Sequence, residues 1–146
     1  MNRGFKRYKL ITKRTYNATS HYFVERDRLD NISEKEEVVA ALNRFSKLLP
    51  KGAMVLDVGC GAGRDSRFLF KKGLKVIGVD FSHKMVEASK KINPKIKYKV
   101  MDLEKLKFKK ETFNGVWANA SLHHIPNPHL KKVFRNVYRI RKRGGS

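Results

Sequence analysis

Short apolar runs alternate with amphipathic stretches through the middle of this chain. The apolar runs have the length of buried strands and cover residues 53–58, 75–79, 96–101 and 115–120. Residues 64–72 and 82–92 have helical spacing, and these predicted helices end at Gly73 and before Pro94. Strands that alternate with helices predict an α/β fold with a parallel sheet, whose ligand lies at the carboxyl ends of the strands.

Two further helices are predicted before the first strand. Residues 33–49 open with the capping box of Ser33 and Glu36, carry apolar side chains along one face and stop at Pro50. Residues 15–29 also have helical spacing. We expect the helix of residues 33–49 to support the sheet.

The first strand runs directly into three glycines at alternate positions. Gly59, Gly61 and Gly63 let the backbone turn tightly and approach a ligand that a Cβ would push away. The helix that follows directs its free N–H groups at the same place. A dinucleotide fingerprint would need glycine or alanine in a slot that Arg64 or Ser66 occupies, depending on the frame. The turn therefore predicts a nucleotide-like cofactor other than a dinucleotide.

Two carboxylates narrow the choice of cofactor. Asp57 comes two residues before Gly59, where it would repel a pyrophosphate and attract an ammonium group. Asp80 ends the second strand 19 residues beyond Gly61, at the spacing of an acid that binds a ribose diol. S-adenosylmethionine carries an ammonium group, a sulfonium and a ribose, but no phosphate. The pattern therefore favours S-adenosylmethionine.

Several ordered segments resemble one known family. Residues 55–90 (VLDVGCGAGRDSRFLFKKGLKVIGVDFSHKMVEASK) resemble the first half of a class I S-adenosylmethionine-dependent methyltransferase. Residues 98–104 (YKVMDLE) resemble its third strand, and residues 113–124 (FNGVWANASLHH) resemble its fourth strand and the loop after it. Residues 131–145 (KKVFRNVYRIRKRGG) are similar to the helix and Gly-Gly turn that lead into its fifth strand.

The resemblance implies a Rossmann-like parallel sheet of strand order 3-2-1-4, flanked by helices and truncated before strands 5–7. Residues 15–146 would form the cofactor-binding methyltransferase domain, incomplete at its C-terminus, and residues 1–14 would be a basic flexible arm. The later strands supply much of the family's acceptor pocket. Without them strand four would have an open edge, through which two copies could associate. A non-catalytic remnant or partner subunit therefore stays open beside an active enzyme.

The resemblance also implies cofactor contacts at the carboxyl ends of the strands. The residues assigned to them are Asp57, Gly59, Cys60, Gly61, Gly63, Asp80, Phe81, Met85, Asp102, Leu103 and Asn119. The glycines would pass beneath the methionine portion, and Asp57 would orient its ammonium group. Asp80 would bind the ribose hydroxyls, while Phe81 and Met85 would flank the adenine. Asp102 would accept a hydrogen bond from the adenine amino group.

Some of these positions have an alternative, purely structural explanation. Asp80 would then serve the dipole of the next helix, and Met85 would fill the core at helical spacing. Cys60, the only cysteine, would pack as a small residue within the turn. Arg64 and Asp65, which open the helix after the glycines, would form a surface ion pair.

The candidate catalytic residues are His123 and His124, which follow the fourth strand where this family faces its acceptor. One of them would take a proton from an O- or N-acceptor, or both would only cap local backbone. Tyr16 and Tyr22 would close the cofactor mouth or pack on the sheet. No metal site is predicted, because adjacent histidines point apart and no cluster has ligand spacing.

The net charge of the chain is relevant to the class of its methyl acceptor. The chain has 34 Lys and Arg against 13 Asp and Glu, a net charge of +21, spread almost evenly along its length. Such a field favours tRNA or rRNA through counterion release, or it only solvates the surface. The resemblance favours a small-molecule acceptor, so RNA is the alternative. A single cysteine and no membrane-length apolar run predict a cytoplasmic protein, with organelle targeting by the basic N-terminus left open.

Overall fold

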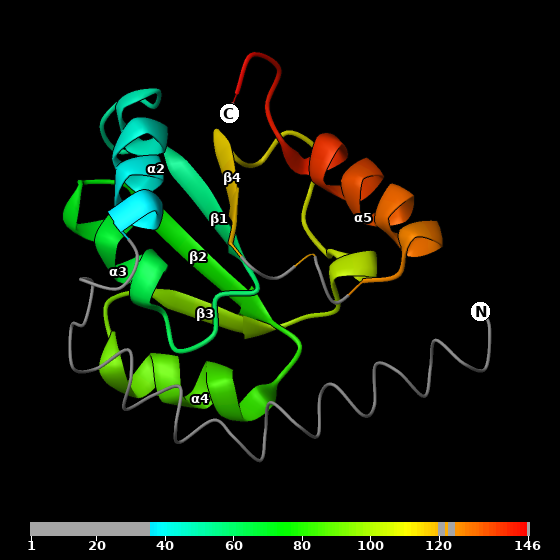
Figure 1. Cartoon of the computed structure of the whole chain (residues 1–146), viewed down its shortest axis with the longest axis horizontal. Helices are drawn as coiled ribbons and strands as arrows, with labels where there is room; N and C mark the ends of the chain where they lie inside the picture. Colours follow the sequence, from blue (N-terminus) through cyan, green and yellow to red (C-terminus); the bar gives the residue numbers. More distant parts are fainter. Residues whose placement is uncertain (1–35, 120–121, 123–124, 146) are drawn as a thin grey trace.

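The chain alternates strands and helices in the predicted order (Figure 1). The computed structural model describes residues 36–119, 122 and 125–145. Its elements are α2 (Glu36–Lys47), β1 (Met54–Val58), α3 (Arg64–Lys71), β2 (Lys75–Asp80), α4 (His83–Ile92), β3 (Lys97–Val100), the 3-10 helix η2 (Leu103–Lys105), β4 (Gly115–Ala118) and α5 (Asn127–Ile140). The four predicted strands and the two helices between them are confirmed, with ends that differ by one or two residues. Among the described helices, none is long and apolar enough to cross a membrane.

The predictions for the first and last helices have different outcomes. The helix predicted over residues 15–29 lies outside the described residues, as do Ser33 and the basic arm. The segment 131–145, which resembles the family's helix and Gly-Gly turn, does contain a helix, α5, which begins four residues earlier at Asn127. Pro128 suits its first turn, where no N–H is needed.

Four parallel strands form one sheet in the order β3-β2-β1-β4, as the resemblance implied. β1 lies in the centre, between β2 and β4. Asp57 in β1 is the register partner of Gly78 in β2 and of Trp117 in β4. Because register partners point to the same face of a sheet, these three positions lie side by side.

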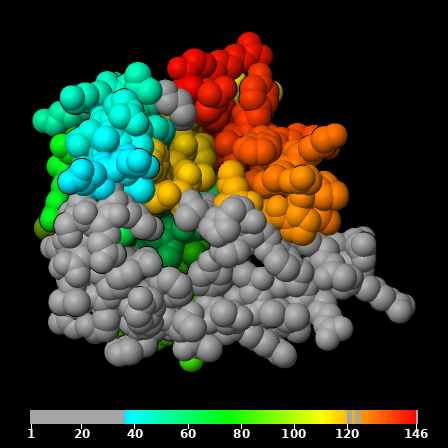
Figure 2. Space-filling model, viewed as in Figure 1, coloured from blue at the N-terminus to red at the C-terminus, as the bar shows by residue number. Residues whose placement is uncertain are grey.

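The two faces of the sheet have separate cores. α2, α3 and α4 cover one face, where Val55 packs with Leu69, and α5 with η2 covers the other, where Leu56 packs with Val133 and Ile140. Figure 2 shows α2 (cyan) and α5 (orange) on opposite sides of β4 (yellow). All five of these side chains are 0% exposed, and full burial of each contributes about 1.5–3 kcal/mol. Both helical layers therefore hold the strand ends in place.

The edge of the sheet beside β4 is partly covered by the segment after α5. Phe113, just before β4, forms a parallel bridge with Arg141. The N–H of Phe113 donates to the carbonyl of Ile140 (3.0 Å), and its own carbonyl accepts from the N–H of Lys142 (2.8 Å). β4 itself is the last strand of the described sheet, and self-association through its edge stays a prediction.

Candidate cofactor site

The turn between β1 and α3 is bound to the end of β2. The N–H groups of Gly59 and Cys60 both donate to the carbonyl of Val79, at 2.8 and 3.0 Å. The N–H of Gly61 donates to Oδ2 of Asp80 at 3.0 Å. The glycine turn and Asp80, which the spacing of 19 residues associated, are therefore in direct contact.

Asp80 also reaches the start of α4. Its Oδ1 accepts from the N–H of Ser82 (2.9 Å), and the Ser82 hydroxyl caps the helix by accepting from the N–H of Met85 (3.3 Å). Burial raises the pKa of Asp80, and the bonds from Ser82, Gly61 and Phe81 oppose that rise. Each carboxylate oxygen can accept more than one hydrogen bond, so Asp80 can serve the helix and a ligand hydroxyl together.

A row of register partners crosses the sheet beneath α3. From β3 to β4 it consists of Tyr98, Gly78, Asp57 and Trp117. The Tyr98 ring lies over Gly78, where an added Cβ would be only 2.5 Å from Cδ1 of the ring. Glycine in the centre of β2 therefore makes room for an aromatic side chain from the neighbouring strand.

Asp57 joins β1 to the first turn of α3. It is 2% exposed, and the Ser66 hydroxyl donates to its Oδ2 at 2.5 Å. Burial is the main cause that raises its pKa to about 7, the charges of Asp65 and Asp80 add to the rise, and the bond from Ser66 opposes it. Asp57 is therefore a buried acid poised to change its charge near neutral pH.

Asp65 joins the same turn of α3 to the end of β4. Its Oδ2 accepts from the indole N–H of Trp117 (2.9 Å) and from Nδ2 of Asn119 (3.1 Å). Its Oδ1 lies 3.4 Å from Nε of Arg64. The expected pair of Arg64 and Asp65 therefore forms, but Asp65 is 9% exposed, so the pair does not lie at the surface as expected.

Gly63 was expected to make room for a ligand, and the described structure gives another reason for it. The Tyr98 hydroxyl occupies the place that a Cβ would take, and Nδ2 of Asn93 would lie 2.8 Å from it. Asn93 in turn donates to the Tyr98 hydroxyl at 3.2 Å. The turn therefore packs tightly against a side chain of β3. The expected contact of Gly63 with a ligand stays a prediction.

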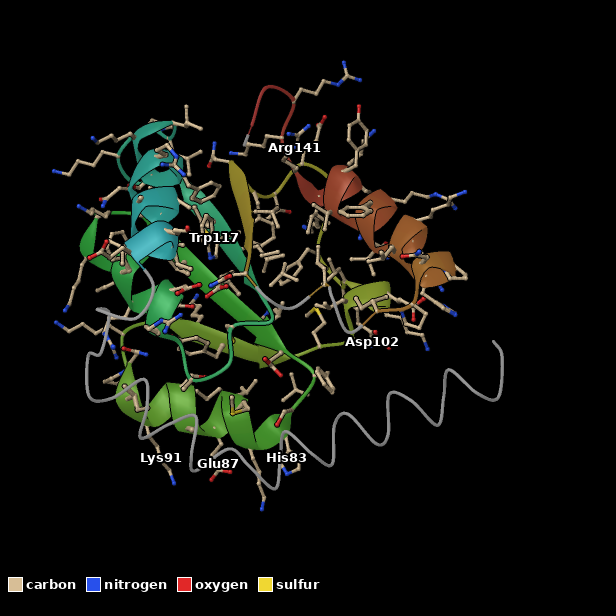
Figure 3. The ribbon with its side chains drawn as sticks, viewed as in Figure 1. His83, Glu87, Lys91, Asp102, Trp117 and Arg141 are labelled. Carbon is tan, nitrogen blue, oxygen red and sulfur yellow. The ribbon has the colours of Figure 1, made fainter. Side chains whose placement is uncertain are left out.

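The residues assigned to the adenine side gather at the ends of β2 and β3. The N–H of Met101 donates to the carbonyl of Asp80 (2.8 Å), which places Asp102 next to the end of β2. Asp102 is partly exposed just beyond β3 (Figure 3), and its Oδ1 accepts from the N–H of Glu104 at 3.0 Å. Leu103 is buried, and Phe81 is partly exposed.

Met85 and Cys60 are buried beside the turn. Met85 is 3% exposed, with its Cε 3.4 Å from the place of a Cβ on Gly61. Cys60 is 8% exposed and belongs to the core on the α3 face. Burial, and then the charges of Asp57 and Asp80, raise the pKa of the Cys60 thiol. The thiol therefore has the environment of a packing residue rather than of a nucleophile.

The candidate bases His123 and His124 lie outside the described residues, as do Tyr16 and Tyr22. A histidine that the sequence did not single out is His129 in the first turn of α5. Its Nδ1 lies 2.9 Å from Oε1 of Glu104, which is 4% exposed. No cluster of His, Cys, Asp or Glu in the described part of the chain could hold a metal ion.

Known proteins share this arrangement of segments. Residues 55–145 match the family described as methyltransferase domain. The chain is 36% identical over 123 residues to 2-methyl-6-phytyl-1,4-hydroquinone methyltransferase from Synechocystis sp., a match that covers 80% of this chain and 38% of that protein. It is 35% identical over 101 residues to ubiquinone biosynthesis O-methyltransferase from Coxiella burnetii, covering 65% and 42%. The chain thus spans about two fifths of the length of these relatives.

Solved structures agree with the sequence relatives. The crystal structure of an S-adenosylmethionine dependent methyltransferase from Mesorhizobium loti matches with a TM-score of 0.61 and 29% identity. That match covers 70% of this chain and 48% of the solved chain. The likeness therefore extends from the sequence segments to the arrangement of strands and helices.

Proposed function

The chain belongs to the class I S-adenosylmethionine-dependent methyltransferases, and on that premise we propose that its glycine turn binds S-adenosylmethionine for methyl transfer to a small-molecule acceptor. The observation that carries the proposal is a pair of buried carboxylates, Asp57 and Asp80, at the ends of adjacent strands on either side of the turn. The ammonium group and the ribose diol are the parts of this cofactor that carboxylates bind.

Asp80 would bind the ribose hydroxyls. Its carboxylate is held by the N–H groups of Gly61 and Ser82, so it is oriented before a ligand arrives and little entropy is lost on binding. Asp102 would accept from the adenine amino group on the next strand, with Leu103 offering its backbone N–H. Phe81 and Met85 would supply apolar contact to the adenine.

Asp57 would attract the ammonium group, directly or through a water molecule. A cation nearby favours the ionised form of a carboxyl whose pKa burial has raised to about 7. Cofactor binding and loss of a proton from Asp57 would therefore be coupled. Gly59 and Cys60 would offer the turn's backbone to the methionine portion.

S-adenosylmethionine, when bound, supplies a methyl carbon that its sulfonium has already activated. The chain's own part is then to orient both reactants and to exclude water. Asn119 lies at the end of β4, next to the segment with His123 and His124. We propose that one of these histidines takes the proton when the acceptor atom carries one.

The acceptor we propose is a small hydroxylated aromatic molecule. The relatives' names refer to a hydroquinone and to ubiquinone biosynthesis, and this chain shares about two fifths of their length. The second candidate is tRNA or rRNA, which the net charge of +21 favours. A cofactor-binding subunit without activity is the third.

Calorimetric titration with S-adenosylmethionine and S-adenosylhomocysteine tests the cofactor assignment. We expect binding by the wild-type chain and affinity lower by roughly tenfold or more for Asp80→Ala, because two backbone N–H groups and the ribose lose an acceptor. Glu87→Ala is the matched control, since Glu87 is an exposed carboxylate on α4, 3.7 Å from Lys91 (Figure 3). Absence of binding by the wild-type chain would contradict the proposal.

Transfer of a labelled methyl group then identifies the acceptor class. Hydroquinones, catechols, small acids and total RNA are offered in separate reactions. Label in an organic extract supports the small-molecule acceptor. Label in RNA that nuclease releases, with steep loss at higher salt, supports the alternative. Cofactor binding with no labelled product supports the inactive subunit.

A further inference from the structure

Asp65 connects the glycine turn, proposed to bind the cofactor, with the end of β4. It follows the glycine turn by two residues, yet its partners Trp117 and Asn119, in β4 and directly after it, lie more than fifty positions away in the sequence. The indole N–H of Trp117 and the amide of Asn119 donate to the same carboxylate oxygen, Oδ2. One carboxylate oxygen thus connects the start of α3 to the carboxyl end of β4.

Neither the helix dipole nor the pair with Arg64 explains the hydrogen bonds that Asp65 accepts from Trp117 and Asn119. An acid in the first turn favours the helix dipole wherever its carboxylate points, and it does so when exposed to solvent. The pair with Arg64 uses the other oxygen, at 3.4 Å. Two donors, one in β4 and one directly after it, and an exposed fraction of 9% for Asp65 instead describe a specific contact between α3 and the end of β4.

The two donors to Asp65 lie close to groups of the proposed site. Trp117 is the register partner of Asp57, so its side chain is on the same face of the sheet as the carboxylate proposed for the ammonium group. The Trp117 ring also packs on Phe45 of α2, with centroids 5.2 Å apart. Asn119 is the first residue after β4. Movement of this strand end would change its distance from the glycine turn.

We propose that Asp65 is a positioning residue, which holds the carboxyl end of β4 at a fixed distance from the cofactor turn so that the groups on both sides of the bound cofactor keep their places. This role rests on the proposed function. In-line transfer depends strongly on placement, so a displacement of about 1 Å is enough to lower a rate by roughly a hundredfold. Asp65 touches neither reactant in this role and acts through Trp117 and Asn119.

The chain carries its own probe of this contact. Trp117 is the only tryptophan, so intrinsic indole fluorescence reports on the partner of Asp65 alone. The test compares Asp65→Ala, Asp65→Asn and Trp117→Phe, with Glu87→Gln as the exposed control. Dissociation constants for S-adenosylhomocysteine are measured by calorimetry below the melting temperature of each variant, after circular dichroism has established that it is folded.

We expect Asp65→Ala to shift the Trp117 emission to longer wavelength, because water replaces the carboxylate. We also expect its dissociation constant for S-adenosylhomocysteine to rise roughly tenfold. Asp65→Asn keeps an oxygen in the same place and should stay within about threefold of wild type. Trp117→Phe keeps an aromatic ring next to Phe45 but removes the indole N–H donor. It should weaken the binding of S-adenosylhomocysteine although Asp65 itself is unchanged.

The outcomes separate this role from the proposed function. A wild-type chain that binds neither form of the cofactor overturns the proposed function and this role with it. Wild-type binding with unchanged dissociation constants in both Asp65→Ala and Trp117→Phe overturns the positioning role alone. Weaker binding in Asp65→Ala that Asp65→Asn restores supports it, because every variant is shown to be folded at the temperature of the titration.

Discussion

The hydroxyl of Tyr98 on β3 occupies the space in which a side chain on Gly63 would begin. Gly63 ends the turn after β1 with φ +88°, a conformation that favours glycine. The turn therefore lies between the proposed cofactor and the buried ring of Tyr98. Its shape depends on β3 as much as on its own residues.

Gly63→Ala should destabilise the protein far more than Gly52→Ala. Both glycines have positive φ, +88° and +77°, but no atom lies within 4 Å of a Cβ on Gly52. Backbone strain alone should cost Gly52→Ala about 1 kcal/mol, whereas the contact with Tyr98 should bring Gly63→Ala to about 3 kcal/mol or more. Urea unfolding followed by circular dichroism measures both values.

The Tyr98→Phe background checks the cause of that difference. Removal of the hydroxyl should lower the cost of Gly63→Ala and leave the cost of Gly52→Ala unchanged. Equal costs for the two alanine variants in the wild-type background would show that Tyr98 does not restrict the turn.

Asp57 should make the stability of the cofactor-free protein fall as pH rises through the acidic range. Its pKa is about 7 in the folded chain against 3.8 for an unperturbed carboxyl, so the native state binds the proton more tightly than the unfolded state. Stability from this group is full below about pH 4, declines up to about pH 7 and is level above that, with a total change of roughly 2–4 kcal/mol. Burial of Asp80 acts in the same direction.

Asp57→Asn isolates this dependence. The amide keeps the shape of the side chain and an acceptor for Ser66, and it cannot titrate. The unfolding free energy of the wild type minus that of Asp57→Asn should therefore fall as pH rises from 4 to 7 and stay level up to pH 8. A flat difference curve would show that Asp57 has an ordinary pKa in the folded chain.

Cys60 should react slowly with thiol reagents. The side chain is buried, and burial with the charges of Asp57 and Asp80 raises its pKa, so little thiolate is accessible at pH 8. We expect modification of the native protein to be at least roughly tenfold slower than modification in guanidinium chloride. As the only cysteine, Cys60 gives an unambiguous count of one thiol. Equal rates in the two conditions would place the thiol at the surface.

His129→Ala should weaken the attachment of α5. The bond to buried Glu104 and the bond from Nδ2 of Asn136 to the Glu104 carbonyl (2.9 Å) join this helix to η2. Loss of the imidazole leaves a buried carboxylate with one partner fewer, at a cost of about 1–3 kcal/mol. Urea unfolding measures this cost, with Lys132→Ala on the exposed side of α5 as the control. If the two variants are equally stable, the His129 contact has no net stabilising effect.

Features that depend on neighbouring residues could be predicted from the sequence. These features are local patterns: strand and helix periodicity, the glycine turn and the carboxylates at positions 57 and 80. The register of β1 and β2 brings the two carboxylates together at the carboxyl ends of these strands. The partner of Asp65 could not be predicted, because Trp117 lies 52 residues further along. The same holds for His129 and Glu104, whose contact requires α5 to fold back onto η2.

The sequence by itself determined the order of strands and helices, the place of the turn and the chemical types at the strand ends, since these follow from side-chain period and backbone freedom. Only the tertiary structure decided what each of those groups contacts. It placed Tyr98 beneath the turn, gave Asp57 its raised pKa through burial, and turned Asp65 from an expected surface residue into a link between α3 and β4. Burial and hydrogen bonding between distant segments arise only when the sheet assembles, which is why local patterns do not contain them.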